Sequence, residues 1–168
     1  YLISSSINGV HVENNLAENN GGAVYFEKDS TSSSTTTTSG IHNTHISSNA
    51  ALKNGGGIYV NDPLGLIMKN TQVQKNVADK NGGGLAFMNN DATATTAKIN
   101  STEFMLDISE DSSISNNVAI KGEGGGIYVS SMHEENRIVL KLGKININNN
   151  HASVGGGVSA KNSIIKFT

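Results

Sequence analysis

Five short segments of this chain place two or three adjacent glycines directly before a strand-like run of residues. The segments are NGGAVYF (20–26), NGGGIYV (54–60), NGGGLAF (81–87), EGGGIYV (123–129) and VGGGVSA (154–160). Adjacent glycines are an unfavourable start for an ordinary strand, because glycine loses more backbone freedom on folding than any other residue. Their recurrence indicates a backbone position, repeated five times, where a Cβ atom cannot be accommodated.

Each glycine segment belongs to a longer repeat, in which an apolar residue is followed three positions later by asparagine and then, after one residue, by alanine. The asparagines are Asn15, Asn49, Asn76, Asn117 and Asn150. They are 34, 27, 41 and 33 residues apart, which suggests a basic unit of about 27 residues with loops inserted in the longer spacings. Low-complexity stretches at 29–40 and 89–102 supply two of these loops, because they contain too little apolar surface to order by burial.

Each unit contains three strand-like stretches: one before the asparagine, one after the glycines, and one between them such as 64–69. We therefore predict an all-β fold, a right-handed parallel β-helix (solenoid) with three short strands per coil and about five to six coils. Like residues then stack from coil to coil in inward columns. One column is Val24, Ile58, Leu85, Ile127 and Val158, the next is Phe26, Val60, Phe87, Val129 and Ala160, and a third is Val12, Ile46, Val73, Ile114 and Ile147.

The glycines and asparagines are predicted to form the corners of the coils. The glycine corners are Gly21, Gly22, Gly55, Gly56, Gly57, Gly82, Gly83, Gly84, Gly124, Gly125, Gly126, Gly155, Gly156 and Gly157. There the backbone either takes a positive φ or approaches the neighbouring coil, and a Cβ would clash. The five asparagines are expected to form an inward-facing ladder, since asparagine tolerates the left-handed conformation and its amide can bond to backbone or to the next coil.

Composition limits the function. The net charge of −2 gives no reason to expect nucleic-acid binding, the absence of cysteine excludes disulfides and thiolate metal sites, and no apolar run is long enough for a direct membrane span. No cofactor is expected. Because the chain begins at Tyr1 and both ends look like strands, we expect residues 1–168 to be a single β-helix segment of a longer solenoid.

The paired motifs, apolar-x-x-Asn and then Gly-Gly-(Ala/Gly)-(Val/Ile/Leu), resemble the repeats of chlamydial polymorphic outer membrane proteins and of related protist surface proteins. Gly21 to Val24 reads Gly-Gly-Ala-Val, close to the Gly-Gly-Ala-Ile motif of that family. This chain departs from the family by carrying glycine for alanine at the other four corners, and Val or Ile for Phe in the Phe-x-x-Asn motif. The resemblance implies a cell-surface right-handed β-helix with adhesive or structural duties and no catalytic residues.

The alternative is a polysaccharide-active β-helix enzyme, a lyase or a hydrolase. Lyases of this fold use clustered acids for calcium and basic residues for proton abstraction, and glycosidases need two carboxylates about 5 to 10 Å apart. Here Arg137 is the single arginine, and the acids are scattered. They include Asp29, Asp62, Asp79, Asp91, Asp107, Glu110 and Asp111. We therefore predict that the chain is not an enzyme.

A metal site is also not expected. His11 and His45 occupy equivalent positions and could stack on adjacent coils, but the same column continues as Gln72, Ser113 and Asn146. Two imidazoles make a weak site, so these are interpreted as surface histidines.

Tyr25, Tyr59 and Tyr128 occupy one outward position, between the two inward residues of their strands. They either form a lateral contact surface for sugar rings or a neighbouring chain, or simply stabilise the ladder. Asn100 is a candidate N-glycosylation site in the sequence Asn-Ser-Thr, and 30–39 could carry O-glycans.

Taken together, these features predict an extracellular or cell-surface protein, a rigid β-helical rod or filament component with structural or adhesive duties. Its expected partners are other protein chains, copies of itself or surface glycans. Open ends of such a rod expose unpaired strand edges, so further coils or another subunit are expected to cover them.

Overall fold

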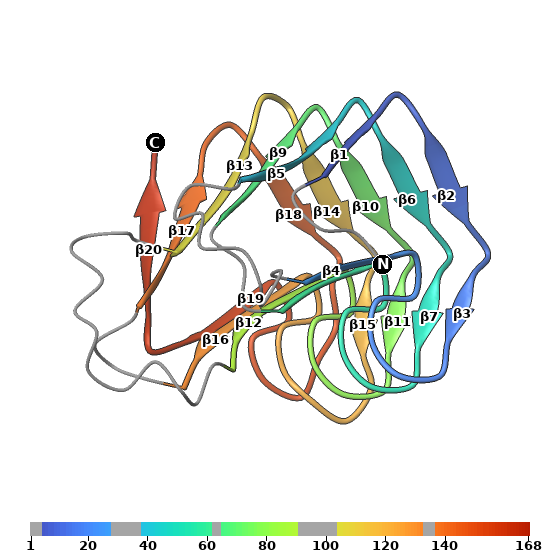
Figure 1. Cartoon of the computed structure of the whole chain (residues 1–168). Coiled ribbons are helices and arrows are strands. Elements are labelled where there is room, and N and C mark those ends of the chain that lie inside the picture. Colours follow the sequence, from blue (N-terminus) through green and yellow to red (C-terminus); the bar gives the residue numbers. More distant parts are fainter. Residues whose placement is uncertain (1–4, 28–37, 62–64, 91–103, 133–136) are drawn as a thin grey trace.

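The structure is a computed structural model that describes residues 5–27, 38–61, 65–90, 104–132 and 137–168. The regular elements in these ranges are all strands, and the strand pairs are parallel. Strands from successive coils stack in four sheets along one axis (Figure 1). The chain therefore winds as a parallel β-helix, and the predicted fold class is confirmed.

Each sheet collects one strand from each coil. The first sheet contains β1 (Ser6–Asn8), β5 (Ser39–His42), β9 (Gly65–Lys69), β13 (Phe104–Ser109), β17 (Ile138–Leu142) and β20 (Ser163–Phe167). The second contains β2 (His11–Glu13), β6 (His45–Ser47), β10 (Gln72–Gln74), β14 (Ser113–Ser115) and β18 (Asn146–Asn148). The third contains β3 (Leu16–Ala17), β7 (Ala50–Ala51), β11 (Val77–Ala78) and β15 (Val118–Ala119). The fourth contains β4 (Val24–Glu27), β8 (Ile58–Asn61), β12 (Leu85–Asn89), β16 (Ile127–Ser131) and β19 (Val158–Lys161).

A coil has four strands rather than the three predicted from the sequence. The additional element is the two-residue strand of the third sheet, which directly follows the asparagine of the repeat. In the fifth coil a single bridge between Val118 and His151 continues this sheet. Two residues are too short to show the alternation that identifies a strand in a sequence. Five full coils and β20, which begins a sixth, agree with the predicted five to six.

The core is formed by like residues that stack in register. In the fourth sheet, Ile58 pairs with Leu85 and Leu85 with Ile127, and all three side chains are fully buried. In the second sheet, Ile46, Val73 and Ile114 stack in the same way. Burying an aliphatic side chain of this size contributes about 1.5–3 kcal/mol, and each coil repeats that contribution.

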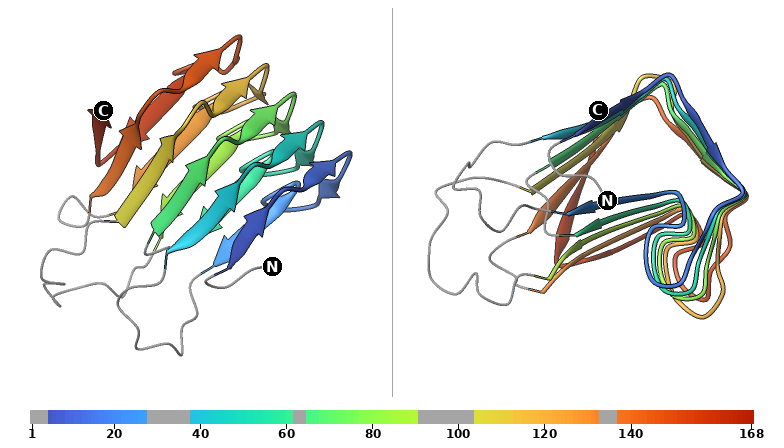
Figure 2. Two further views of the ribbon diagram at one scale, coloured as in Figure 1. Left: turned by 90° about the horizontal axis from the view of Figure 1, so that it is seen from above. Right: turned by 45° about the vertical axis from the view of Figure 1, so that its right-hand side comes forward.

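Between the third and fourth sheets the backbone makes a narrow outward loop before it returns to the axis. These corner loops comprise residues 18–23, 52–57, 79–84, 120–126 and 153–157. Figure 2 shows that they lie one above the next and form a ridge along one side of the solenoid. The glycine corners lie at the end of each loop, where the chain enters the fourth sheet.

Candidate functional site

The first glycine of each corner loop reverses the chain in a left-handed backbone conformation. The φ angles are 69° at Gly21, 66° at Gly55, 66° at Gly82, 64° at Gly124 and 59° at Gly155. Residues with a Cβ adopt this conformation at a steric cost, whereas glycine does not. The turn into the fourth sheet therefore depends on glycine at this position in every coil.

The second glycine is required for a different reason, the close approach of the next coil. A Cβ built on Gly56 or on Gly83 would lie well inside 3.0 Å of backbone carbonyl groups of the following coil. The third position is less restrictive. A Cβ on Gly57 would lie 2.8 Å from the carbonyl oxygen of Gly84 and 3.1 Å from the Asn76 side chain. The first coil has Ala23 at this third position.

The asparagine column joins all five coils through side-chain amides. At Asn76, Nδ2 donates to Oδ1 of Asn117 (3.0 Å) and to the carbonyl oxygen of Ile46 (3.1 Å). Its Oδ1 accepts from both the backbone N–H and Nδ2 of Asn49, each at 3.0 Å. The same amide-to-amide bond links Asn15 to Asn49 and Asn117 to Asn150.

These amides are buried and fully paired. Asn49 is 1% exposed, and Asn76 and Asn117 are 0% exposed. Among the described residues, no buried side-chain nitrogen or oxygen lacks a hydrogen-bond partner. Removing one member would leave its neighbours' donors and acceptors unpaired in the core, so this column holds the corner between the second and third sheets.

A second asparagine column runs through the corner loops and was not identified in the sequence. Its members are Asn20, Asn54 and Asn81. Nδ2 of Asn54 donates to Oδ1 of Asn20 (3.1 Å), and Nδ2 of Asn81 donates to Oδ1 of Asn54 (3.2 Å). The backbone N–H of Glu123 ends the column by donating to Oδ1 of Asn81 (3.0 Å). Its signal was the asparagine directly before the first glycine in three of the five aligned segments.

Two other repeated features also gave little signal in the sequence. Each residue before the asparagine column has a positive φ, and these residues are Asn14, Ser48, Lys75, Asn116 and Asn149. A serine or a lysine in the sequence gives no indication of a positive φ.

A small polar column also lies at the corner between the first and second sheets. The sequence around Thr71 shows no pattern specific to a turn. In the structure, its N–H donates to Oγ of Ser112 (3.2 Å) and its Oγ1 donates to the carbonyl oxygen of Ile41 (3.2 Å).

The tyrosine column lies on the outer face of the fourth sheet but is not an exposed surface. Tyr25 and Tyr59 stack with ring centroids 5.2 Å apart. Tyr59 is only 4% exposed and Tyr128 only 6%, and they form a second apolar cluster with Ala86. The burial of Tyr59 and Tyr128 favours the alternative in which the tyrosines stabilise the ladder, and the lateral contact surface stays a prediction.

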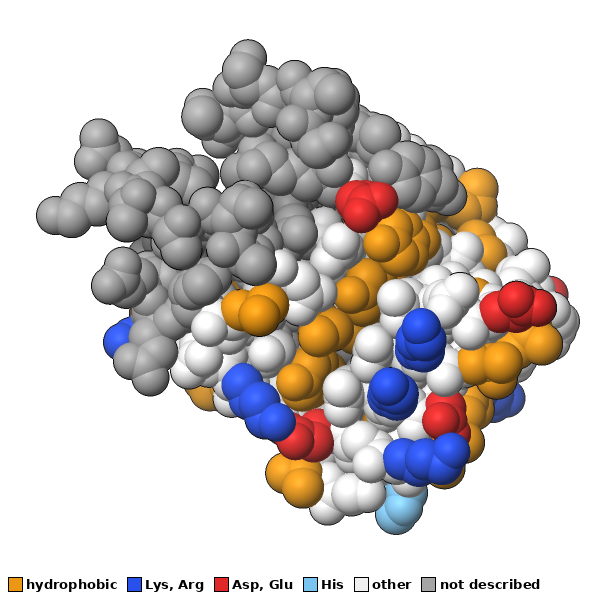
Figure 3. Space-filling model, turned by 60° about the horizontal axis from the view of Figure 1, so that its bottom comes forward, with side chains coloured by type: hydrophobic (Ala, Val, Ile, Leu, Met, Phe, Trp, Pro, Cys, Tyr) orange, Lys and Arg blue, Asp and Glu red, His pale blue; other side chains and the backbone are white. Residues whose placement is uncertain are grey.

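The path of the corner loops helps to explain this burial. Each loop returns beside the outer face of the fourth sheet, so that a Cβ on Gly55 would lie 2.9 Å from Cβ of Tyr59. Nδ2 of Asn90 lies 3.4 Å from the Tyr59 hydroxyl, and Nζ of Lys161 lies 6.0 Å from the Tyr128 ring centroid. Figure 3 looks onto this face, where a hydrophobic stripe runs beside a ridge that carries lysines. The tyrosine column is thus packed against its surroundings, and we call Tyr25, Tyr59 and Tyr128 the tyrosine seam.

Because Tyr59 is packed, we expect Tyr59→Ser to lower the free energy of unfolding by about 2–4 kcal/mol. Tyr59→Phe keeps the ring and loses only the hydroxyl contact, so its loss is expected to stay below about 1 kcal/mol. Urea unfolding followed by circular dichroism measures both. Equal stability of the Ser variant and the parent protein would show that this face is open to solvent.

An ion pair closes one end of the tyrosine seam. Nζ of Lys161 lies 2.7 Å from Oε1 of Glu123, and Oγ of Ser159 donates to Oε2 of Glu123 (2.8 Å). The hydrogen bonds from Lys161 and from Ser159 lower the pKa of the Glu123 carboxyl below its ordinary value. The bond to Glu123 likewise raises the pKa of Lys161.

The directions of these pKa shifts predict a pH window for the pair. The contribution of Glu123 is present above the ordinary glutamate pKa and is lost as the pH falls through its lowered pKa. The contribution of Lys161 is present below the ordinary lysine pKa and is lost as the pH rises through its raised pKa. We expect Lys161→Met to lower stability slightly between these limits and to have less effect beyond them. Lys53→Met is the control, because Lys53 forms no ion pair within the described residues. A pH-independent difference for Lys161→Met would contradict the assignment.

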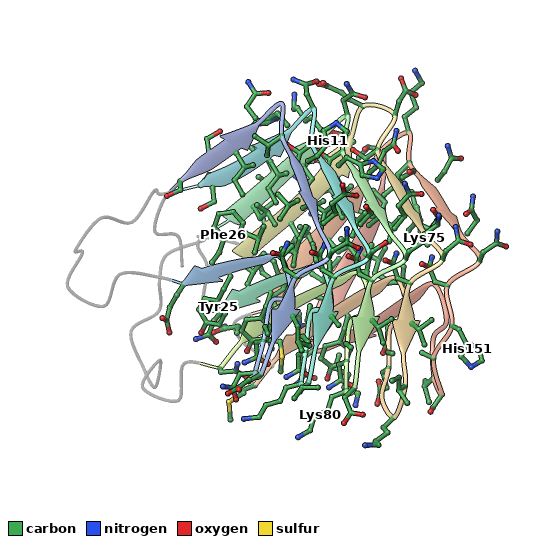
Figure 4. The ribbon with its side chains drawn as sticks, turned by 90° about the vertical axis from the view of Figure 1, so that its right-hand side faces the viewer. His11, Tyr25, Phe26, Lys75, Lys80 and His151 are labelled. Carbon is green, nitrogen blue, oxygen red and sulfur yellow. The ribbon has the colours of Figure 1, made fainter. Side chains whose placement is uncertain are left out.

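The two histidines stack on adjacent coils. The rings of His11 and His45 have centroids 5.4 Å apart at an interplanar angle of 25°. Nδ1 of His45 lies 3.2 Å from Oε1 of Gln72, and its Nε2 lies 2.9 Å from Nε2 of Gln74, so amides occupy both nitrogens. Figure 4 shows His11 on the outside of the second sheet, far from Tyr25 on the fourth. In the described ranges no three His, Cys, Asp or Glu side chains group in a way that could hold a metal ion.

Asp79, Glu110 and Asp111 lie in separate surface ion pairs, each with a single lysine. Glu110 lies 2.6 Å from Nζ of Lys69, and Asp111 lies 3.1 Å from Nζ of Lys144. The hydrogen bond to Glu110 raises the pKa of Lys69. This pair of acids borders an open hollow of about 750 Å³. Solvated ion pairs of this kind contribute little to the stability of the fold, and they give no indication that these carboxylates act in acid–base chemistry.

Several predicted positions lie outside the described residues. They are Asp29, Asp62, Asp91, the candidate glycosylation site Asn100, and most of the stretch 30–39. Within the described residues, no helix has the length and apolar character needed to cross a membrane.

The comparison with protein families gives one match, in two places. The Chlamydia polymorphic membrane protein repeat matches residues 9–27 and 111–130. No curated protein and no solved structure gives a significant match. Each matched segment contains an asparagine of the first column and a glycine corner that the structure places at the same positions of its coil. This chain is therefore a parallel β-helix that carries polymorphic membrane protein-type repeats.

Proposed function

We propose that this chain is a stiff segment of an extracellular surface rod, which holds adhesive surfaces away from the membrane. The observation that carries the proposal is the continuity of hydrogen bonds along the axis. The first, second and fourth sheets and the asparagine column link the first coil to the fifth without interruption, and the third sheet links the first four coils.

The corner loops add to this continuity, although loops in most folds are the compliant parts. The N–H of Lys53 donates to the carbonyl oxygen of Asn19 (2.8 Å), and the N–H of Lys80 donates to that of Lys53 (2.8 Å). The N–H of Gly56 donates to the carbonyl oxygen of Gly82 (3.0 Å). Bending the rod would strain these bonds together with the sheets, so we expect it to resist bending on all sides.

The repeat type supports a surface location, and the adhesive role is our further inference from it. Partners are expected to be copies of this chain, other surface proteins or glycans. A non-enzymatic role is supported by the solvated ion pairs of Asp79, Glu110 and Asp111 with single lysines. The polysaccharide-active alternative has no comparable support in the described residues.

Two measurements test the two parts of the proposal. Pulling on single molecules through tags at both ends should give stepwise rupture of coils, whereas smooth extension at low force would contradict a stiff rod.

Beads coated with the chain should bind to a cell monolayer, and beads coated with the urea-unfolded chain at equal density should not. Equal binding of both bead types, or no binding of either, would remove the adhesive part and leave the mechanical part standing.

A further inference from the structure

The chain contains four Asn-Gly steps, at 8–9, 20–21, 54–55 and 81–82. In such a step the backbone nitrogen of glycine can attack Cγ of the asparagine. The bond from Cγ to Nδ2 breaks, ammonia leaves and a succinimide ring forms. Water then opens the ring at either carbonyl, which yields aspartate or isoaspartate. The only co-reactant is water, and asparagine is accordingly counted among the thermolabile residues.

The structure separates these four steps sharply. We propose that Asn8 is a site of spontaneous conversion to aspartate and isoaspartate, and that the second asparagine column suppresses the same reaction at Asn54 and Asn81. The reaction requires a free glycine nitrogen, a reachable Cγ and room for the ring, and the four sites differ in the last two of these.

The glycine nitrogens do not distinguish the sites, because each N–H donates to a carbonyl oxygen of the next coil. The N···O distances are 3.1 Å at Gly9, 3.0 Å at Gly21, 2.9 Å at Gly55 and 2.9 Å at Gly82.

The amides of the interior sites are held on both sides. Nδ2 of Asn54, which would leave as ammonia, donates to Asn20, and its Oδ1 accepts from the N–H and Nδ2 of Asn81. Asn81 is held in the same way between Asn54 and the N–H of Glu123. Rotating the Asn54 amide toward its glycine nitrogen would break three bonds together, and rotating the Asn81 amide would break two.

The amide of Asn8 is held less tightly. The side chain is exposed, and Nδ2 of Asn43 donates to its Oδ1 at 3.0 Å. Space differs as well. A Cβ added at Gly9 would meet no atom within 4 Å, whereas at Gly82 it would lie 2.4 Å from the carbonyl oxygen of Leu85 and 2.7 Å from Cβ of Ala86. The ring therefore has room at Asn8 and has none at Asn81.

The consequence is a modification confined to the first of the described coils. Isoaspartate would add a backbone atom at the end of β1, where Asn8 pairs with His42. The first coil would lose register and gain a negative charge, while the interior coils would keep their corners. Asn20 lies in the first coil but in the second column, so its rate is expected between those of Asn8 and Asn54.

The test is a time course of the intact folded chain at 37 °C and mildly alkaline pH in ¹⁸O-water, with peptide mapping of each site. The reference is the same chain in urea, where all four sites are free. We expect Asn8 to react within about threefold of its unfolded rate, and Asn54 and Asn81 at least about tenfold slower than theirs. Comparable protection at Asn8 and Asn54, or reaction at Asn81 as fast as at Asn8, would overturn the proposal.

Two variants identify the source of the protection. Asn20→Ala removes the acceptor of the Asn54 amide, so it should accelerate reaction at Asn54 and leave Asn81 unchanged. An unchanged rate at Asn54 would show that the column does not protect it. Asn8→Gln should abolish label uptake in the peptide that contains residue 8 and leave the other three sites as they were.

Discussion

Replacing Gly83 with alanine is expected to unfold the solenoid, whereas the same replacement at Gly156 is expected to be tolerated. Both are the second glycine of their corner. A Cβ at Gly83 would lie 2.5 Å from the carbonyl oxygens of Gly125 and Val118, which belong to the following coil. At Gly156, in the last coil that the structure describes, the nearest atom is the Asn150 carbonyl oxygen at 3.0 Å. The difference between the variants thus isolates the approach of one coil to the next.

Backbone atoms cannot move aside as a flexible side chain can, so Gly83→Ala must separate the third and fourth coils. We expect a loss of more than about 4 kcal/mol, against a total of about 5–15 kcal/mol for a domain of ordinary stability. For Gly156→Ala we expect less than about 1 kcal/mol. Urea unfolding measures the difference, and hydrogen exchange would show whether the loss spreads from the altered coil. Equal effects at both positions would mean that glycine entropy, rather than contact between coils, explains the corner.

Gly84→Ala is the matched control within the same corner. Its Cβ would lie 2.7 Å from the carbonyl oxygen of Gly126 and 3.0 Å from Nδ2 of Asn117, which is a side-chain atom. Ala23 occupies the equivalent position in the first coil and is accommodated there. We therefore expect a loss less than half of that for Gly83→Ala.

The stacking itself could be predicted because each layer of the repeat carries the same residue in the same place. Once Asn15, Asn49 and Asn76 are aligned, the inward columns follow from period-2 alternation on either side, and the register of Ile58 with Leu85 follows from the alignment. The stacking of His11 on His45 follows from the same alignment. In a repeated sequence, the alignment of the repeats alone therefore predicts which residues contact one another in adjacent coils.

The alignment of the repeats does not reveal the path that the chain takes between the stacked columns. The two-residue strand at Val77–Ala78 was missed because it is too short to alternate. The burial of Tyr59 was missed because an outward position in a strand says which face a side chain occupies, but not what lies beside that face. Gly55 sets the path of the corner loop that packs beside Tyr59, but the sequence of the loop indicates only that the turn is tight.

Replacing Asn76 with alanine is the second change expected to have a large effect. It would leave the backbone N–H of Asn49 without its acceptor and the carbonyl oxygen of Ile46 without its side-chain donor, at a site with no solvent exposure. It would also remove one acceptor of Nδ2 of Asn49 and one of the two donors to Oδ1 of Asn117. Each unpaired buried group costs about 1–3 kcal/mol, and partial entry of water offsets some of this. We expect a loss of about 3–5 kcal/mol, measured by urea unfolding.

Asn15→Ala is the position-matched control, because Asn15 begins the column and is exposed. It would lose its bonds to the Glu13 carbonyl oxygen and to Oδ1 of Asn49, but its backbone N–H would still donate to that Oδ1. We expect less than about 1 kcal/mol. A similar loss at both positions would mean that the column stabilises the fold through local turn geometry at each coil, rather than through pairing between buried amides.

Asn76→Asp separates hydrogen bonding from shape, because the two side chains have nearly the same volume. Its second oxygen would face two acceptors, Oδ1 of Asn117 and the carbonyl oxygen of Ile46, in place of the donor Nδ2. Burial and these acceptors would raise the pKa of the new carboxyl in the folded state, since the protonated form can donate one bond. The destabilisation is therefore expected to be fully present above the raised pKa and to diminish as the pH falls through it toward the ordinary aspartate value. A stability difference between Asn76→Asp and the parent protein that stays constant over that range would contradict a column held by amide donors.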